Sequence, residues 1–507
     1  MPTTNEKIGH LIAQIRQDKG YTQAEFARQL NTSQSAVNRM EHGRQNLSLE
    51  TLGRVSDVLN KQLISLSEGA INLRIEGGHE LSGSISLKTS KNATVALLCA
   101  SLLNRGVTRL KNVARIEEVN RIIEVLTSIG VSIKWTSEND LEIKQPNKLD
   151  LTNIDKAAAT KTRSVLMLIG PLMHLFKQFN IPYSGGCDLG RRTVLPHLYG
   201  LEEFGVGVLT KSGQYEISVN RQLPVRDVVL YESGDTTTEN ILMAAARTPG
   251  QTIIKMASAN YMVQDLCFFL TKLGVKIDGI GTSTLKVQGL EDISRNVTHS
   301  PAEDPVEAMT FISAAVTTNS SITIQRAPID FLELELLKLE KMGLKSDISS
   351  KYKSDNGQTD LVDITIHKHN GKLVAPVEKI HPNIFPGLNI DHLPYFVPIA
   401  AVANGRTLIH DWVYEDRALM YTEIKKIGVN LELADPHRVF IEGPTRWKSA
   451  DLVCPSGIRP AVMLLIGMLA APGQSILRNV YTINRGYEDL AKRLNSLGAQ
   501  ITVLHDI

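Results

Sequence analysis

Ile129-Gly130-Val131 is the first of six places where an apolar residue, a glycine and another apolar residue follow a helical stretch. A glycine directly after a helix adopts the left-handed conformation without strain, so a strand can begin there. The other five copies are Phe204-Gly205-Val206, Leu273-Gly274-Val275, Met342-Gly343-Leu344, Ile427-Gly428-Val429 and Leu497-Gly498-Ala499. Their glycines lie 75, 69, 69, 85 and 70 residues apart, which fits no solenoid period. The repeat predicts six α/β units arranged as two lobes of three.

The composition is that of an ordinary soluble globular protein. The chain has 507 residues, which is too long for one compact core and predicts two to four domains. Its net charge of +2 argues against a surface that coats nucleic acid or membranes. The start, Met1 to Lys7, lacks the apolar segment of a signal peptide, and no apolar run is as long as a membrane span. We therefore expect a cytoplasmic protein with no membrane partner.

The four cysteines are Cys99, Cys187, Cys267 and Cys454, and no two of them form a CxxC pair. This spacing predicts reduced thiols rather than a disulfide framework or a zinc site. Cys99 and Cys267 lie in apolar runs and are expected to pack in the core. No other metal-ligand spacing occurs, so we expect no metal and no cofactor.

Cys187 lies instead in the glycine-rich stretch Ser184-Gly-Gly-Cys-Asp-Leu-Gly-Arg-Arg192. Glycines let a ligand approach the backbone closely, and neighbouring arginines favour a poised thiol. Arginine side chains also bind phosphate or carboxylate groups with two hydrogen bonds. The stretch predicts a mobile loop that handles an anionic substrate with a reactive thiol. The alternative is a surface turn that carries an incidental cysteine.

Residues 4–60 are predicted to form consecutive short helices. Residues 22–30 begin with a capping-box pattern, and residues 33–42 begin with a serine that can cap a helix. Residues 31–32 predict a tight turn between these two helices. Gly20 is expected to end a preceding helix, and Ser48 to open a following one. Two short helices joined by a tight turn are typical of a helix-turn-helix module.

Tyr21-Thr-Gln-Ala-Glu-Phe-Ala and Ser33-Gln-Ser-Ala-Val-Asn-Arg-Met-Glu-His-Gly resemble the lambda-repressor-type (XRE-like) DNA-binding family. The resemblance implies a small all-α domain over residues 1–68, with its third helix in the major groove of DNA. The side chains that it places toward DNA are Gln23, Gln34, Ser35, Asn38 and Arg39. Eight Lys and Arg against seven Asp and Glu give this segment a weak positive charge, which predicts low affinity unless the module is a homodimer. The alternative is a domain kept for protein contacts.

The six predicted units and the glycine-rich stretch resemble the enolpyruvyl transferase family, most closely the branch that acts on UDP-N-acetylglucosamine. The resemblance covers about residues 72–507. It implies an α/β fold, a two-lobed inside-out barrel with the active site in the cleft between the lobes. Lobe one would span about residues 91–302, and lobe two residues 72–90 plus 303–507.

Four basic residues in matching motifs imply a site for phosphoenolpyruvate. They are Lys91 in Ser90-Lys-Asn-Ala93, Arg192 in the glycine-rich stretch, Arg459 in Gly457-Ile-Arg459 and Arg485 in Ile483-Asn-Arg-Gly-Tyr487. Together their charges can neutralise a phosphate and a carboxylate. Each one alone is more often a solvated surface charge, but their joint occurrence in matching contexts favours the substrate site.

The same resemblance implies residues for the sugar nucleotide and for catalysis. The sugar-nucleotide residues would be Asn92, Arg163, His197, Asp304 and Arg417. Phe385-Pro386 followed by Asp391 resembles the family's Phe-Pro-Thr-Asp, with three extra residues before the aspartate. Asp391 would accept the proton of the acceptor's 3-hydroxyl, and Cys187 would act as general acid or assist product release. The reaction would transfer the enolpyruvyl group of phosphoenolpyruvate and release phosphate.

Several departures from the family pattern leave the acceptor open. Asn260 stands where the family has a glutamate, Gly457 replaces an aspartate, and Leu195 replaces an acidic residue. Glu232 and Asp235 place acids near the segment that binds a diphosphate. One alternative is therefore an enolpyruvyl transferase for another nucleotide acceptor. A second is a transcriptional regulator with a transferase-like sensor domain. Resemblance to the shikimate-phosphate branch is weaker, because that branch lacks the cysteine loop.

Overall fold

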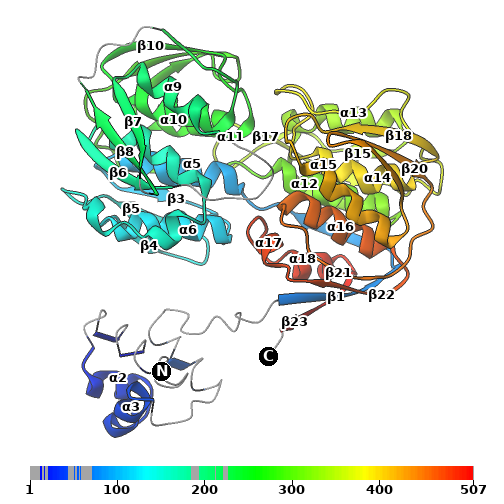
Figure 1. Ribbon diagram of the computed structural model, residues 1–507, viewed down its shortest axis with the longest axis horizontal. Helices are drawn as coiled ribbons and strands as arrows, with labels where there is room; N and C mark the ends of the chain where they lie inside the picture. Colours follow the sequence, from blue (N-terminus) through cyan, green and yellow to red (C-terminus); the bar gives the residue numbers. More distant parts are fainter. Residues whose placement is uncertain are drawn as a thin grey trace. The chain divides into compact units, whose positions relative to one another are not determined.

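The computed structural model describes residues 21–43, 71–183, 193–211, 213–220 and 227–505, with a few single positions and pairs between residues 9 and 58. The chain divides into two compact units (Figure 1). One unit is Met1–Asn72 with Leu504–Ile507, and the other is Leu73–Val503. No helix in these described ranges is long and apolar enough to cross a membrane.

The N-terminal unit contains the two predicted central helices, α2 (Gln23–Gln29) and α3 (Gln34–Glu41). Thr22 and Glu25 form a reciprocal capping box at the start of α2, and Ser33 accepts a hydrogen bond from the backbone of Ala36 at the start of α3. Both predicted caps are therefore confirmed. A small apolar core joins the helices, with Ile12, Phe26, Ala27, Leu30, Val37, Met40 and Val55 buried. Gly20 and Ser48, which were expected to bound the neighbouring helices, lie outside the described residues.

The described part of the larger unit forms six small sheets, and we call the half with the first three of them lobe one. Its sheets, in strand order, are β13 (Val297–His299), β3 (Thr108–Leu110), β5 (Leu141–Lys144) and β4 (Ser132–Trp135); β6 (Gln178–Pro182), β8 (Gln214–Val219) and β7 (Val206–Lys211); and β11 (Lys276–Asp278), β12 (Thr284–Gly289), β10 (Gly250–Lys255) and β9 (Asp227–Val229). Its helices are α5 (Lys91–Ala100), η1 (Ser101–Leu103), α6 (Glu117–Ser128), η2 (Leu151–Asn153), α7 (Lys156–Ala159), η3 (Arg163–Leu168), α8 (Ile169–Leu172), α9 (Leu195–Glu202), α10 (Asp235–Ala246) and α11 (Tyr261–Lys272).

Lobe two repeats this plan with strands β1 and β2 from the N-terminal side and strands from the second half of the chain. Its sheets are β15 (Ser346–Ile348), β17 (Asp360–Ile366), β14 (Ser321–Pro328) and β2 (Ser82–Ser86), with β16 (Tyr352–Lys353) beside β17; β18 (Gly405–His410), β20 (Arg438–Gly443) and β19 (Asn430–Asp435); and β21 (Asp451–Val453), β22 (Gly473–Arg478), β1 (Ile71–Gly77) and β23 (Gln500–His505). Its helices are α12 (Pro305–Thr317), η4 (Ile329–Phe331), α13 (Glu333–Lys341), η5 (Leu393–Tyr395), α14 (Phe396–Val402), α15 (Arg417–Tyr421), η6 (Thr422–Ile427), α16 (Ile458–Ala470), α17 (Tyr481–Asn484) and α18 (Leu490–Ser496).

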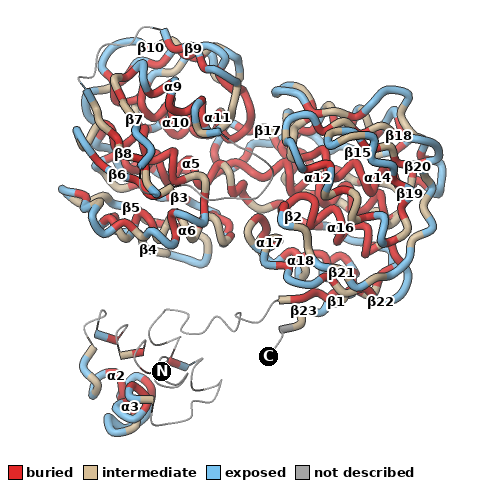
Figure 2. Tube along the Cα trace, viewed as in Figure 1, coloured by how far each residue is buried: buried red, intermediate tan, exposed pale blue. Residues whose placement is uncertain are grey.

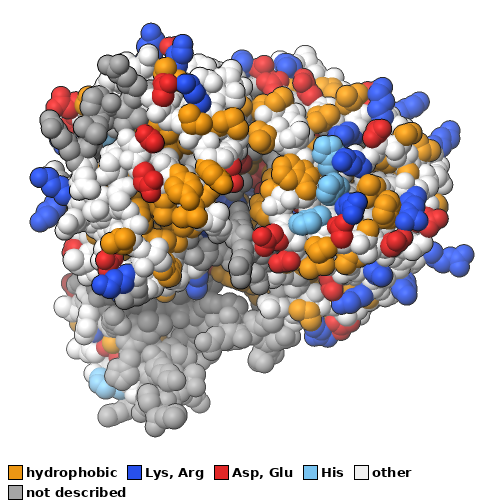
Figure 3. All heavy atoms as spheres, turned by 45° about the horizontal axis from the view of Figure 1, so that its top comes forward, with side chains coloured by type: hydrophobic (Ala, Val, Ile, Leu, Met, Phe, Trp, Pro, Cys, Tyr) orange, Lys and Arg blue, Asp and Glu red, His pale blue; other side chains and the backbone are white. Residues whose placement is uncertain are grey.

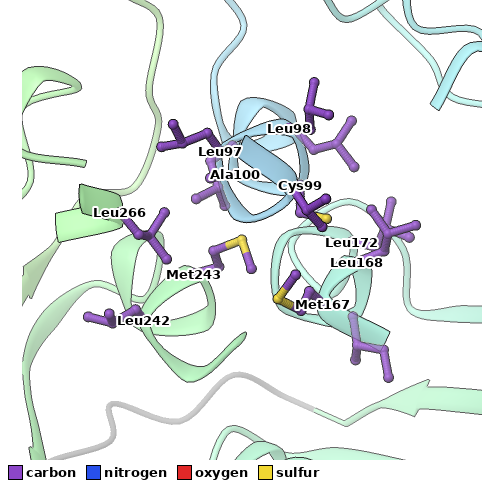
Figure 4. Close-up of a cluster of buried hydrophobic side chains, with 14 of the residues drawn as sticks. Leu97, Leu98, Cys99, Ala100, Met167, Leu168, Leu172, Leu242, Met243 and Leu266 are labelled. Carbon is purple, nitrogen blue, oxygen red and sulfur yellow. The ribbon is translucent and has the colours of Figure 1, made fainter. Parts of the chain in front are cut away.

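The most apolar helices form the centre of each lobe, and the sheets lie outside them (Figure 2). In lobe two, α12, α14 and α16 pack against one another, and every residue of α12 is buried. In lobe one, α5 and α10 pack against η3, and the side chains of Cys99, Met167 and Met243 meet between them (Figure 4). A helix that is apolar on all sides must be covered on all sides. This requirement explains the inside-out arrangement, in which amphipathic sheets surround helices.

All six repeat glycines adopt the left-handed conformation, with φ between the 76° of Gly205 and the 104° of Gly428. In four of the units, the N–H after the glycine donates to the carbonyl five residues earlier, as from Val131 to Leu126. In each of the six repeated α/β units, the glycine precedes the strand that opens the second half of the repeat. The predicted role of the repeat is therefore confirmed.

Replacing Gly130 with alanine is expected to lower the free energy of unfolding by roughly 1–2 kcal/mol, the cost of a left-handed backbone for a residue with a Cβ. An added Cβ would meet nothing closer than the Pro146 ring at 3.6 Å, so the loss comes from the backbone alone. Gly428→Ala is expected to cost more, because its Cβ would lie 2.5 Å from the Arg446 carbonyl oxygen. Thermal melting of the two variants tests this order of their losses in stability. Equal or negligible losses of stability in the two variants would contradict it.

Two antiparallel segments, residues 88–90 and residues 302–304, connect the lobes. Ser90 donates from its backbone to Ala302 (2.7 Å), and Asp304 donates to Lys88 (3.0 Å). Helix α5 starts directly after the first segment and α12 directly after the second. The first residues of both helices are therefore held at the junction of the lobes. The predicted lobe limits near residues 90 and 303 remain a prediction.

Candidate active site

A cavity of about 600 Å³ is lined by residues from both lobes, and the surface is hollowed between them in the space-filling view (Figure 3). Eight of the residues predicted for the substrate site line it. They are Lys91, Asn92, Arg163, His197, Asp391, Arg417, Arg459 and Arg485. Lobe one supplies the first four and lobe two the last four. The structure thus brings together most of a set that is spread over nearly 400 positions of the sequence.

Asp391 lies between two arginines of lobe two. Arg459, in the first turn of α16, places Nη2 3.3 Å from one carboxylate oxygen, and Arg417, at the start of α15, places Nη1 3.8 Å from the other. Burial alone would raise the pKa of Asp391, but Arg459, Arg417 and Lys91 together hold it below its usual value. Asp391 is therefore a carboxylate at neutral pH.

Arg417 is itself held by a buried network. Its guanidinium makes two bonds to Asp411, of 2.6 and 3.0 Å, and donates to the carbonyl of Ile390 at 2.8 Å. Tyr421 donates to the same Asp411 carboxylate. The arginine is 1% exposed, so its position beside Asp391 is fixed by buried partners rather than by solvent.

Lys91 forms an ion pair with Glu118 of α6, with 2.5 Å between Nζ and Oε2. Thr162 donates to the other oxygen of Glu118 at 3.2 Å. Burial raises the pKa of Glu118, but the charges of Lys91 and Arg485 and the hydrogen bonds outweigh it, so the pKa lies below its usual value. Glu118 is therefore ionised and holds Lys91 toward the cavity. An anionic substrate that binds Lys91 must share it with this carboxylate.

His197, on α9, lines the cavity. Thr236 contacts its Nε2 and Asn240 its Nδ1, each at 3.3 Å. Burial, together with the charge of Arg163, lowers the pKa of His197 to about 3. The ring is therefore neutral and acts as a hydrogen-bonding group.

Because the folded protein binds a proton at His197 less readily than the unfolded chain does, acid should destabilise the fold through this residue. This destabilising contribution of His197 to the free energy of folding is absent above the ordinary pKa of 6.5 and grows as the pH falls toward 3. We expect the melting temperature of the wild type to fall more between pH 7 and pH 4.5 than that of His197→Gln. The matched control is His367→Gln, at a half-exposed histidine. An equal fall in the melting temperature of the wild type and of His197→Gln would contradict the lowered pKa of His197.

Three predicted residues do not lie in the described lining. Asp304 is buried at the start of α12, where its carboxylate accepts hydrogen bonds from the backbone of Val306 and Glu307. It therefore caps a helix next to the cavity. Cys187 and Arg192 lie outside the described residues, with the rest of the glycine-rich stretch.

Cys99 and Cys267 are fully buried in the apolar core, as expected. No group of histidine, cysteine, aspartate and glutamate side chains that could hold a metal occurs among the described residues.

Several lining residues were not assigned a role from the sequence. Besides Glu118, they include Glu232, Asp235 and Glu239 on and before α10, together with Ser258 and Asn260 of the segment before α11. Asp235 accepts hydrogen bonds from Ser258 (2.5 Å) and Asn260 (3.1 Å). Asn260 and Asp235 were visible only as departures from a family pattern. Their contact depends on the packing of α10 against α11 and could not be read from the sequence.

In the N-terminal unit, Gln34, Ser35, Asn38 and Arg39 are exposed on α3. Arg39 donates to Ser35 at 3.0 Å, so these two side chains lie on one face. Gln23, at the start of α2, donates to Glu41 at 2.7 Å and is partly buried.

Two family models match the chain. Residues 75–494 match the family described as EPSP synthase (3-phosphoshikimate 1-carboxyvinyltransferase), and residues 12–66 match a helix-turn-helix family. Both resemblances seen in the sequence are thereby confirmed.

Curated relatives and solved structures agree with the first model. A protein named UDP-N-acetylglucosamine 1-carboxyvinyltransferase from Nitratiruptor sp. is 30% identical to this chain, over 86% of this chain and 99% of its own length. A protein of the same name from Treponema denticola is 32% identical, over 84% of this chain and 98% of its own length. The enolpyruvyl transferase NikO from Streptomyces tendae superposes with a TM-score of 0.74 at 24% identity, over 87% of this chain and all of that one. An EPSP synthase from Acinetobacter baumannii gives 0.66 at 17% identity, over 86% of this chain and all of that one. The predicted α/β fold class is confirmed.

Proposed function

Because the chain belongs to the EPSP synthase family, we propose that it transfers the enolpyruvyl group of phosphoenolpyruvate to the 3-hydroxyl of UDP-N-acetylglucosamine and releases phosphate. This is the first committed step of peptidoglycan precursor synthesis. The observation that carries the proposal is the set of charges in the cavity, where Asp391 lies beside Arg459 and Arg417, opposite Lys91. The names of the relatives, at about 30% identity over nearly the whole of their length, favour this acceptor.

The cationic side chains would bind the donor. Lys91, Arg459 and Arg485 line the same cavity, and Arg192 would join them from the glycine-rich stretch. Phosphoenolpyruvate carries a phosphate and a carboxylate, and guanidinium groups bind both with paired, charge-assisted hydrogen bonds. The same cations would stabilise the phosphate as it leaves.

The chemistry needs a proton donor and a proton acceptor. Protonation of C3 of the enol, with Cys187 as general acid, leaves positive charge at C2. The 3-hydroxyl oxygen of the acceptor attacks C2 while Asp391 accepts its proton. Loss of a proton from C3 and of phosphate from C2 then restores the double bond in the product. A carboxylate kept ionised by its arginines is in the correct state for this role at neutral pH.

Phosphate release by the full chain with both substrates tests the proposal, with mass spectrometry of the product. We expect release in the wild type and its loss in Asp391→Ala and Cys187→Ala. Asp451→Asn, which removes an exposed carboxylate paired with Arg478, is the matched control. No release by the wild type with this acceptor would refute it.

A second candidate keeps the donor and changes the acceptor to another nucleotide. The acids Glu232 and Asp235 favour it, because they line the cavity near the segment expected to bind a diphosphate. A screen of nucleotides and sugar nucleotides by phosphate release would decide, since this candidate requires faster turnover with an acceptor other than UDP-N-acetylglucosamine.

We also propose that the N-terminal unit binds double-stranded DNA through α3. The exposed amide and guanidinium groups of Gln34, Asn38 and Arg39 suit contacts with base edges or phosphates. Selection from a pool of DNA fragments, followed by fluorescence anisotropy at two salt concentrations, tests this role. Binding should fall in Gln34→Ala/Arg39→Ala and persist in Gln29→Ala, an exposed residue of α2. Equal binding by both variants would contradict a role for α3.

A further inference from the structure

The wall of the cavity formed by α10 carries two carboxyl groups that the proposed reaction does not use. Asp235 is the first residue of α10, and Glu239 lies one turn later on the same face, because side chains four residues apart on a helix are neighbours. Both line the cavity. Asp391, the proposed base, faces Asp235 from the other lobe and adds to the effect of burial in raising its pKa.

Asp235 is held in place by neutral hydrogen-bond donors. Ser258 donates to one oxygen at 2.5 Å and Asn260 to the other at 3.1 Å, and these two residues are 2% and 8% exposed. Each carboxyl oxygen has a second lone pair that remains available. The amide of Asn260 thus occupies a position where the family has a glutamate, while Asp235 supplies a carboxyl group 3.1 Å away.

Glu239 provides an independent sign of a ligand. It is 1% exposed, and its Oε1 has no hydrogen-bond partner among the described residues. An unsatisfied buried polar atom costs about 1–3 kcal/mol, so native proteins rarely keep one without a bound group or water to satisfy it. Burial, with the nearby Asp235 and Asp265, raises the pKa of Glu239 well above its usual value, so this carboxyl can donate as well as accept.

The charges on this wall decide which part of an acceptor it can bind. Among the wall residues named here, Glu232, Asp235 and Glu239 are acidic and Ser258 and Asn260 are neutral, so none of them balances a phosphate. Any carboxyl group of this wall that is ionised would repel a phosphate placed against it in a partly buried site. Sugar hydroxyl and amide N–H groups, in contrast, are the natural partners of carboxyl oxygens.

We propose that Asp235 and Glu239, with Ser258 and Asn260, form a subsite that binds hydroxyl or amide N–H groups of the acceptor rather than its phosphates. The proposal rests on the transferase function proposed above and identifies Asp235 as a specificity-determining residue. It also explains why the serine and the asparagine converge on one carboxyl group, since together they fix its orientation toward the acceptor.

Steady-state kinetics of the full chain, with UDP-N-acetylglucosamine and phosphoenolpyruvate varied separately, test the subsite. Asp235→Asn should raise the KM for the acceptor roughly tenfold, because the hydrogen bond from the acceptor to this carboxyl group is lost, and should change kcat and the KM for phosphoenolpyruvate less than about threefold. Asn260→Asp places two carboxyl groups in contact and should raise the acceptor KM similarly. The double exchange Asp235→Asn/Asn260→Asp restores one amide and one carboxyl and should return the acceptor KM to within about threefold of the wild type.

Asp227→Asn is the matched control, since it removes an exposed carboxylate of the same lobe and should leave all constants within about twofold. A lower acceptor KM in Asp235→Asn would mean that a phosphate faces α10, and unchanged constants would mean that no acceptor group reaches Asp235. Either result overturns the subsite while leaving the transferase function intact. If the wild type shows no turnover, calorimetric binding of UDP-N-acetylglucosamine to the same variants decides. Weaker binding in both single variants with recovery in the double exchange supports the subsite, and equal or absent binding overturns it.

Discussion

Replacing Asp391 with asparagine is expected to lower the rate of phosphate release roughly 10²–10⁴-fold, the usual contribution of a positioned general base. Asparagine keeps the size of the side chain but cannot accept the proton of the 3-hydroxyl. Because Arg459 and Arg417 both face this position, the neutral amide also leaves two buried guanidinium groups without their shared carboxylate. The KM values should change much less than kcat.

The measurement is initial phosphate release under saturating substrates, with Asp363→Asn as control. Asp363 is a partly buried carboxylate of β17 that accepts from Tyr352 and lies outside the cavity lining. The melting temperature of both variants should be recorded, so that a loss of structure is not mistaken for a loss of chemistry. A variant that keeps more than about a tenth of the wild-type rate would assign the base to another residue.

The fold could be predicted from the sequence because its signals are local. Each repeat glycine must follow a helix and precede a strand, and the left-handed φ of Gly130, for example, needs only its own neighbours. The caps at Thr22 and Ser33 are equally local. Residues in recognisable motifs, such as Lys91 and Arg459, could be placed in the cavity for the same reason.

The partners of those residues could not be predicted, because they depend on tertiary packing. Glu118 meets Lys91 only because α6 packs against α5, and no pattern around Glu118 marks it. The contact of Asp235 with Asn260 joins two helices whose relative placement the sequence does not state. Asp304 was expected to bind the sugar nucleotide, and its carboxylate caps α12 beside the cavity, so its substrate role stays a prediction.

These partners set the protonation states on which the proposed chemistry depends. Asp391 and Asp235 face one cavity from opposite lobes, yet arginines lower the pKa of the first and burial raises that of the second. Two carboxyl groups whose pKa values are driven apart can perform different tasks at one pH. We therefore expect the ionised Asp391 to accept protons and Asp235 to act in recognition.

Replacing Arg459 with methionine is expected to raise the KM for phosphoenolpyruvate by roughly tenfold or more, because charge-assisted hydrogen bonds to an anion are among the strongest in proteins. The side chain is 7% exposed, and it contacts both Asp391 and the hydroxyl of Tyr487. Arg459→Lys should be intermediate, because lysine keeps the charge but not the paired donors. The exposed Arg478 provides the matched control, Arg478→Met, which should leave the KM unchanged.

The same variant makes a prediction about pH. Burial raises the pKa of Asp391, and the charge of Arg459 is the largest of the effects that lower it. Removing Arg459 must therefore raise this pKa, so the carboxylate becomes protonated at a higher pH than in the wild type. The acid limb of the kcat/KM profile should move to higher pH in Arg459→Met and stay in place in Arg478→Met. A shift to lower pH, or no shift with a raised KM, would show that Arg459 binds substrate without controlling the ionisation of Asp391.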